Sequence, residues 1–182
     1  VNYSGEGEDD DYVFAECQDG GGFNNANMAT PPDGYNPVMQ MYLWQRGQLQ
    51  DMLVINSPSS IEGTYITSNL SAFGPAVPEG GITANLALLQ DALGENLGCS
   101  AVTNASELTG KIVLVKRGEC NFTDKVLRAQ TAGAVACIII NNTAGLTNPG
   151  GDNDNISIPS FMITKTDGEN FIAHLENGED IN

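Results

Sequence analysis

The sequence predicts an α/β domain, because residues 111–142 have the pattern of a strand, a helix and a second strand. Two continuous aliphatic and β-branched runs, residues 112–115 (IVLV) and 135–140 (VACIII), are typical of parallel strands buried on both faces. The residues between them that share one helical face are spaced by four, three and four: Phe122, Val126, Ala129 and Gly133. A parallel pair joined by one helix is expected to cross over in the right-handed sense.

Capping residues set the expected starts of two helices. Asn121 lies at the N-cap position of the first helix, with Asp124 three residues on as in a capping box, and Gly133 follows the last turn as a stop signal. A second capping box, Thr166-x-x-Glu169, opens another short helix near the end of the chain. The sequence therefore predicts two helices beside the sheet.

Other apolar runs extend the predicted sheet. Residues 52–55 and 64–67 are short β-type runs separated by turn residues, which predicts an antiparallel pair. Residues 82–89 are interpreted as a further strand, and residues 161–163 as another. The long polar loop over residues 141–157 is of the kind that is usually functional or mobile in compact domains.

Residues 1–50 predict an acidic, loop-rich arm, separate from a folded domain over residues 51–182. The arm has an acidic run, then a stretch of Gly and Asn at 20–27 and the turn sequence PPDG, with little to bury. Only residues 39–44 (MQMYLW) are expected to form a strand. The arm is too poor in apolar residues to make a core by itself.

The charge balance excludes two classes of partner. Seven basic residues stand against twenty-three acidic ones, a formal net charge of −16. A phosphate backbone or an anionic membrane surface would be repelled, so we expect no nucleic acid and no membrane partner. No apolar run approaches the roughly twenty residues that span a bilayer.

Four cysteines allow three complete pairings. Cys99 and Cys120 lie in polar, Gly-flanked loops on either side of the first core strand, whereas Cys137 lies within an apolar strand as a buried small hydrophobe. This context favours a Cys99–Cys120 disulfide. Zinc-site spacing such as Cys-x-x-Cys is absent from the sequence, so a structural role is favoured over metal binding.

No residue is assigned a catalytic role or a metal. His174 is the only histidine, and neither His-Glu-x-x-His nor Gly-x-Ser-x-Gly occurs, so a surface or boundary position is favoured for it. Asp152 and Asp154 alternate with Asn as at the start of a calcium loop, but the sixth-position Gly and the bidentate Glu are missing. Calcium stays a weak alternative to a plain solvated turn.

A candidate peptide site is expected beyond the carboxyl ends of the core strands, where ligands tend to bind in open α/β arrangements. If the two strands are neighbours, the turn over residues 117–122 lies near the 141–157 loop. The alternative is a tight turn clamped by the disulfide, with no ligand. The candidate peptide-binding residues are Arg117, Gly118, Asn121, Phe122, Asn142, Asp152 and Asp154.

Three motifs together resemble the protease-associated domain: LTGKIVLVKRGECNFTDKV (108–126), AQTAGA (129–134) and IPSFMITKTDG (158–168). The resemblance covers about residues 51–177. It implies a β-rich sandwich or partly open barrel with short flanking helices. It also implies a non-catalytic module, since members of this family are inserts in peptidases and sorting receptors.

The arm resembles a different family. Residues 18–34 (QDGGGFNNANMATPPDG) and 39–44 are similar to the fungalysin family of secreted zinc metallopeptidases, in the segment upstream of the zinc-binding helix. The resemblance implies an extracellular parent metalloendopeptidase that holds zinc outside these residues. It also implies that this chain's partners are its own catalytic domain and protein or peptide substrates.

Three hypotheses follow from these resemblances. The first is a protease-associated insert that recruits protein substrates or covers the active site, using strand edges and the 142–157 loop. The second is a structural spacer or maturation module without substrate contact. The third, an enzyme in its own right, is the weakest because the chain has no catalytic set.

Overall fold

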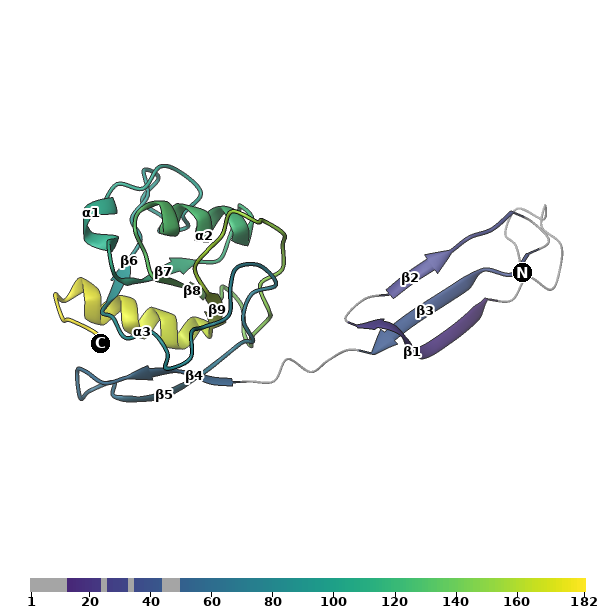
Figure 1. Cartoon of the computed structure of the whole chain (residues 1–182), viewed down its shortest axis with the longest axis horizontal. Coiled ribbons are helices and arrows are strands. Elements are labelled where there is room, and N and C mark those ends of the chain that lie inside the picture. The colour runs from purple at the N-terminus through teal and green to yellow at the C-terminus, as the bar shows by residue number, and fades with distance from the viewer. Residues whose placement is uncertain (1–12, 24–25, 33–34, 44–49) are drawn as a thin grey trace. The chain divides into compact units, whose positions relative to one another are not determined.

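The computed structural model describes residues 13–23, 26–32, 35–43 and 50–182. The chain divides into two compact units, Val1–Arg46 and Gly47–Asn182, which are described separately. Figure 1 shows both.

The first unit contains a three-stranded sheet in the order β1-β3-β2. Its strands are β1 (Phe14–Phe23), β2 (Ala26–Ala29) and β3 (Val38–Leu43). β1 is parallel to β3, with register shifts between Cys17 and Phe23, and β2 is antiparallel to β3. The strand predicted at 39–44 is confirmed for residues 39–43, and residue 44 lies outside the described residues. The interpretation of 20–27 as a loop is wrong where β1 and β2 include it. The partner strand β3 supplies backbone pairing, which the local Gly and Asn composition does not predict.

The second unit is built on one six-stranded mixed sheet in the order β4-β5-β9-β8-β7-β6. Its strands are β4 (Gln50–Ile55), β5 (Gly63–Thr67), β6 (Leu86–Leu88), β7 (Ile112–Lys116), β8 (Ala136–Ile140) and β9 (Ser160–Ile163). Its helices are α1 (Ala105–Leu108), α2 (Phe122–Thr131) and α3 (Lys165–Glu176).

Strands β6 to β9 are parallel to one another, and β4 and β5 form an antiparallel pair. The predicted hairpin over 52–55 and 64–67 is thus confirmed. The strand predicted at 82–89 is confirmed only for Leu86–Leu88, because residues 82–85 lie outside the ladder. α2 connects the neighbouring parallel strands β7 and β8.

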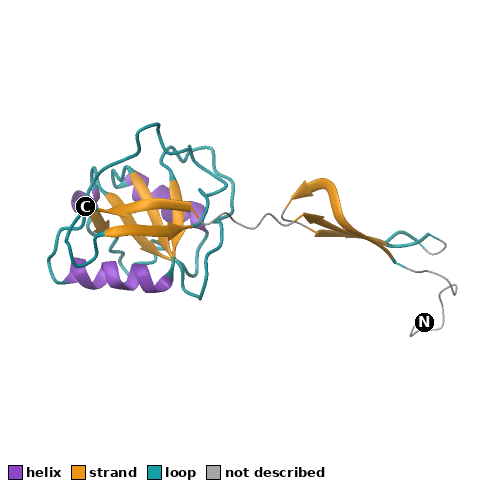
Figure 2. Ribbon diagram, turned by 90° about the horizontal axis from the view of Figure 1, so that it is seen from below, coloured by secondary structure: helices purple, strands orange, loops and turns teal. Residues whose placement is uncertain are grey.

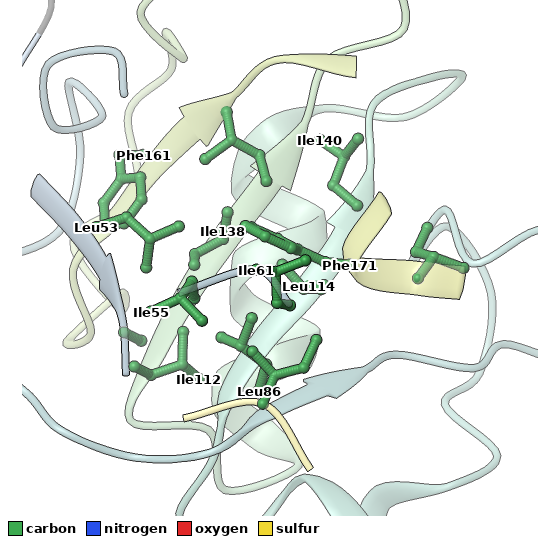
Figure 3. Packing of buried hydrophobic residues seen from close by; sticks show 14 residues of the cluster. Leu53, Ile55, Ile61, Leu86, Ile112, Leu114, Ile138, Ile140, Phe161 and Phe171 are labelled. Atoms are coloured by element: carbon green, nitrogen blue, oxygen red, sulfur yellow. The ribbon is translucent and has the colours of Figure 1, made fainter. Parts of the chain in front are cut away.

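Both faces of the parallel strands are buried, which explains their continuous apolar runs. On one face, Val113 and Ile139 pack with Val126 of α2. On the other, Leu114 and Ile138 pack with Phe171 of α3, as Figure 3 shows. Figure 1 shows α2 and α3 on opposite sides of the sheet. Successive residues of one strand therefore serve two separate cores.

The β4–β5 hairpin folds over the α3 face of the sheet. It joins the parallel strands through a single pair, Thr67 with Ile163, and Figure 2 shows it crossing over them. Leu53 of β4 consequently shares a core with Ile138 of β8. Asn182 pairs with Ser57 just beyond β4 through hydrogen bonds of 3.0 and 3.1 Å, while the amide of Leu86 donates to the carbonyl of Ile181 at 2.8 Å. These last residues link the two ends of the sheet.

The two predicted capping boxes are wrong in detail. Asn121 is the N-cap of α2, but its side chain makes no capping hydrogen bond, so Asp124 completes no box. α3 begins two residues earlier than predicted, with Thr164 as its N-cap. The Thr164 hydroxyl accepts from the Asp167 amide at 3.1 Å and donates to the Asp167 carboxylate at 2.6 Å. Both Thr-x-x-acid patterns fit the sequence, and the one that caps begins directly after β9, which ends at Ile163.

Replacing each threonine separately distinguishes these two registers. We expect Thr164→Ala to lower the free energy of unfolding by about 1 kcal/mol, because the Asp167 amide loses its acceptor. The matched control Thr166→Ala changes an exposed side chain inside the helix and should be close to neutral. Urea unfolding of both variants measures this. A larger loss for Thr166→Ala would contradict the assigned cap.

Gly168 allows α3 to lie close to β8. A Cβ atom at this position would lie 2.6 Å from Cγ1 and 2.9 Å from Cβ of Ile140. We expect Gly168→Ala to destabilise the domain by roughly 1–3 kcal/mol despite the better helix propensity of Ala, because the interface is overpacked. Thermal unfolding measures the loss. A stabilised Gly168→Ala variant would show that helix propensity outweighs the clash.

Candidate functional site

The turn after β7 and the loop after β8 meet at the carboxyl ends of these two strands. The amide of Arg117 donates to the carbonyl of Ile140 at 2.8 Å. The Arg117 Nη1 atom donates to Asn141 Oδ1 at 2.9 Å and contacts Thr147 Oγ1 at 3.5 Å. The guanidinium carbon lies 5.6 Å from the centroid of the Phe122 ring. The structure therefore brings Arg117 and Phe122 together with the start of the 141–157 loop.

Asn141 organises this contact although the sequence analysis did not single it out. It is only 2% exposed, and its side-chain amide donates to the carbonyl of Gly145 at 2.8 Å. Its Oδ1 atom also accepts from the amide of Asn142 at 3.0 Å. A polar residue directly after a fully apolar strand was the available signal. Asn141 thus holds the loop in a shape that presents an acceptor to Arg117.

Arg117 has hydrogen-bonding capacity to spare. In the described ranges the ion pairs are Lys165–Glu169 and His174–Glu179, so no carboxylate neutralises this guanidinium. Its hydrogen bonds there use Nη1 alone, and a guanidinium carries five N–H donors. A partly buried arginine of this kind can take a peptide carbonyl or a carboxylate.

The other candidate residues lie around this pair to different extents. Gly118 has a φ of +148°, and a Cβ there would lie 3.0 Å from Leu97. Asn121 and Asn142 are exposed at the two edges of the turn and loop. Asp152 and Asp154 are also exposed, and neither makes a hydrogen bond or ion pair with Arg117 across the described chain.

The second half of the loop is attached elsewhere. Gln130 of α2 donates to the carbonyl of Asn155 at 2.9 Å and accepts from the amide of Ser157 at 2.6 Å. Asn153 Oδ1 accepts from the Asn155 amide, closing a local turn. Over the described residues, no group of three or more His, Cys, Asp or Glu side chains could hold a metal. We therefore assign no calcium ligand here.

Cys99 and Cys120 form a disulfide that ties the turn to the segment before it, with a Cα–Cα distance of 5.6 Å. Cys137 is a free cysteine and fully buried, and burial raises the pKa of its thiol to about 12. His174 lies on α3 beside Glu179 Oε1 at 3.0 Å. The His174 side chain is 19% exposed, which is a boundary position.

A buried cation supports the disulfide, and the sequence analysis missed it. Lys125 is 0% exposed, and its Nζ donates to the carbonyl of Leu97 at 2.5 Å and lies 3.3 Å from Cys99 Sγ. Burial lowers the pKa of Lys125 to about 8, and the Asp91 carboxylate partly opposes this shift. Lys125 is three residues after Phe122 and four before Ala129, so helical spacing already placed it on the buried face.

An apolar cavity of about 210 Å³ lies beside the edge strand β4, apart from the Arg117 cluster. Its walls come from β4, from residues 81–84 and from the sheet, and include Leu53, Ile82 and Phe161. No helix in the described part of the chain is long and apolar enough to cross a membrane.

Fold and site together define an α/β domain of mixed sheet, whose loops at the ends of β7 and β8 carry a cation beside an aromatic ring. The sequence profile of the PA domain family matches residues 74–171. The match covers more than half of the chain, and the chain belongs to this family.

Three similar proteins are peptidases by name. Leucine aminopeptidase 2 of Arthroderma otae is 31% identical over 141 residues, 77% of this chain and 26% of that protein. Probable extracellular metalloproteinase 2 of Arthroderma benhamiae is 42% identical over 83 residues, 42% of this chain and 12% of that protein. The solved aminopeptidase from Aneurinibacillus sp. strain AM-1 has a TM-score of 0.54 at 30% identity, covering 66% of this chain and 27% of its own. The chain thus spans about a quarter or less of their lengths.

The buried ammonium makes stability depend on pH. Between pH 8 and the ordinary lysine pKa of about 10.4, the unfolded chain binds a proton at Lys125 that the folded chain does not, so stability rises with pH. We expect the free energy of unfolding to gain roughly 2 kcal/mol from this group between pH 7.5 and 9.5. Denaturant unfolding of the unaltered chain against Lys125→Met isolates it, with exposed Lys165→Met as the matched control. Parallel pH curves for the unaltered and Lys125→Met chains would refute a depressed pKa.

Proposed function

We propose that this chain is the substrate-recruiting, non-catalytic PA module of a secreted zinc metallopeptidase. The observation that carries the proposal is Arg117, which is fixed by Asn141 and Phe122 yet has donors to spare and no carboxylate partner among the residues that the structure describes. A peptide carbonyl or carboxylate would meet these donors, and the Phe122 ring would offer an apolar contact beside them.

The peptidase reaction would belong to the rest of the parent protein. The chain has one histidine and no His-Glu-x-x-His, so it cannot supply the two histidine ligands and the glutamate of that zinc motif. The two curated relatives described above are named as peptidases and are about four or more times longer than the matched part. We therefore place zinc and the general base in a catalytic domain that would be this chain's partner.

The class of the parent rests on the first unit of the chain. The arm motif over 18–34 resembles fungalysins, which favours a metalloendopeptidase, and the metalloproteinase relative agrees with this choice. The aminopeptidase relatives support an exopeptidase parent as the second candidate. A disulfide and a relative named as extracellular both support secretion.

A strand edge would give the module a second way to hold an extended chain. β4 is the last strand at one side of its sheet, and the 210 Å³ apolar cavity opens beside it. Strand addition would use backbone hydrogen bonds for affinity and the cavity for one aliphatic side chain. The Arg117 cluster remains our first choice because its side chains are already oriented.

Binding of unfolded protein substrates tests the proposal. We expect amide shifts in the ¹⁵N-labelled chain to cluster at residues 117–122 and 141–147 when unfolded casein or gelatin is added. Arg117→Ala should weaken binding about 10-fold to 100-fold, because a charge-assisted hydrogen bond contributes about 1.5–3 kcal/mol. Lys165→Ala removes one exposed cation from α3 and is the matched control. Shifts confined to β4 would favour strand addition.

One observation supports the spacer hypothesis. Hydrogen bonds from Arg117 to Asn141 and Thr147, together with the disulfide, already hold the turn in place without a ligand. Deleting residues 51–182 from the parent peptidase separates the two functions. Loss of activity on large proteins with small-peptide hydrolysis intact would support recruitment. A parent that no longer folds or matures, with no binding by the isolated chain at millimolar substrate, would support the spacer.

A further inference from the structure

The two sulfur atoms of the Cys99–Cys120 disulfide lie in different surroundings. Cys99 Sγ has the Lys125 ammonium at 3.3 Å and the backbone amide of Cys120 at 3.3 Å. That amide is shared, since it also donates to the carbonyl of Gly118 at 2.8 Å, so Lys125 is the main donor to this sulfur. Its nearest carbonyl oxygens, those of Gly118 and Leu97, are farther away at 3.5 and 3.7 Å. Cys120 Sγ has only a distant carbonyl, that of Gly98 at 3.8 Å, and no donor among the described residues.

The charges around the turn add to this asymmetry. Arg128 Nη1 donates at 3.2 Å to the carbonyl of Gly98, the residue before Cys99, so a second cation contacts this segment. The Asp91 carboxylate accepts from the amides of Gly98 and Glu95, and the Glu119 carboxylate also acts on Lys125. The Lys125 ammonium is the charged group in contact with Cys99 Sγ, and this contact favours negative charge on Cys99. A full charge at 3.3 Å in a buried position outweighs carbonyl dipoles that are farther away.

We propose that this disulfide is a directional thiol-exchange site, at which a small thiol modifies Cys120 while Cys99 leaves as a thiolate beside Lys125. The inference concerns covalent chemistry of the turn and does not depend on peptide recruitment. Leaving-group stability sets which sulfur is attacked, because the better-stabilised thiolate departs faster.

The exchange balances in two steps. An external thiolate attacks Cys120 Sγ, a new S–S bond forms, and the Cys99–Cys120 bond breaks with its electron pair on Cys99. The Lys125 ammonium neutralises that thiolate without giving up its proton. If the reductant is a dithiol, its second thiolate attacks the reductant's own sulfur in the mixed disulfide and releases Cys120 as a thiolate. The dithiol then becomes a cyclic disulfide, and the protein disulfide has gained two electrons.

The position of the site gives the exchange a structural consequence. Cys120 lies within the 117–122 turn, whereas Lys125 and Arg128 reach the Leu97–Cys99 segment from α2. Breaking the disulfide removes the covalent anchor of the turn and leaves the contacts of α2 in place. The Lys125–Cys99 ion pair would replace one of the lost constraints.

Adduct mapping tests the direction of exchange. The full chain in a Cys17→Ser background is exposed briefly to limiting glutathione, quenched with acid, and alkylated with N-ethylmaleimide before peptide mapping. We expect glutathione on Cys120 and the maleimide on Cys99, with about tenfold or greater preference over the reverse pattern. Equal amounts of glutathione on the two cysteines, or glutathione mainly on Cys99, would overturn the proposal.

The role of the ammonium has its own measurement. In Lys125→Met, we expect the preference for Cys120 to fall to about twofold or less and the exchange rate to drop, since Cys99 loses its cation. Lys165→Met is the matched control and should leave both unchanged. A preference that persists in a folded Lys125→Met chain would show that Lys125 is not its cause.

Discussion

The parallel register of β7 and β8 determines where the functional groups of this domain lie. Lys116 pairs with Ile140, so the next residues, Arg117 and Asn141, leave the sheet at the same edge. A shift of one residue would turn the apolar side chains of one strand toward the wrong core and separate these two polar groups. Burial on both faces therefore enforces the same register that assembles the candidate site.

The turn over 117–122 is held by anchors of different physical kinds. The disulfide acts mainly by restricting the unfolded chain, and a loop of this size is expected to contribute roughly 3 kcal/mol. Lys125 instead acts in the folded state, where a buried ammonium must recover its lost hydration from a carbonyl, a sulfur and the Asp91 carboxylate. A buried ammonium of this kind costs stability. It is therefore not a stabilising contact, and its distinctive effect is to place a positive charge beside Cys99.

The sequence predicted the parts of this fold that depend on local pattern and missed those that depend on pairing at a distance. The apolar runs that became β7 and β8 and the first residue of α2 follow from periodicity and capping. β1 continues across three glycines because Asp19 and Phe23 on either side of them pair with β3, which composition does not show. Thr164 and Thr166 offer equivalent capping patterns in the sequence, and only the structure identifies Thr164 as the cap. At the site, Arg117 was predicted as a turn residue after a core strand, but Asn141 and Lys125 act while buried.

Charge acts on this chain at two ranges, and the two charges have opposite signs. The net charge of −16 of the whole chain favours cationic partners at a distance, but salt screens it beyond about 8 Å at physiological ionic strength. Arg117 acts only at contact, where no described carboxylate pairs with it and where Phe122 and Asn141 limit its motion. Under the proposed function, the geometry of a peptide's carbonyl or carboxylate groups would determine whether Arg117 binds it. Long-range attraction would affect the rate of encounter more than the choice of peptide.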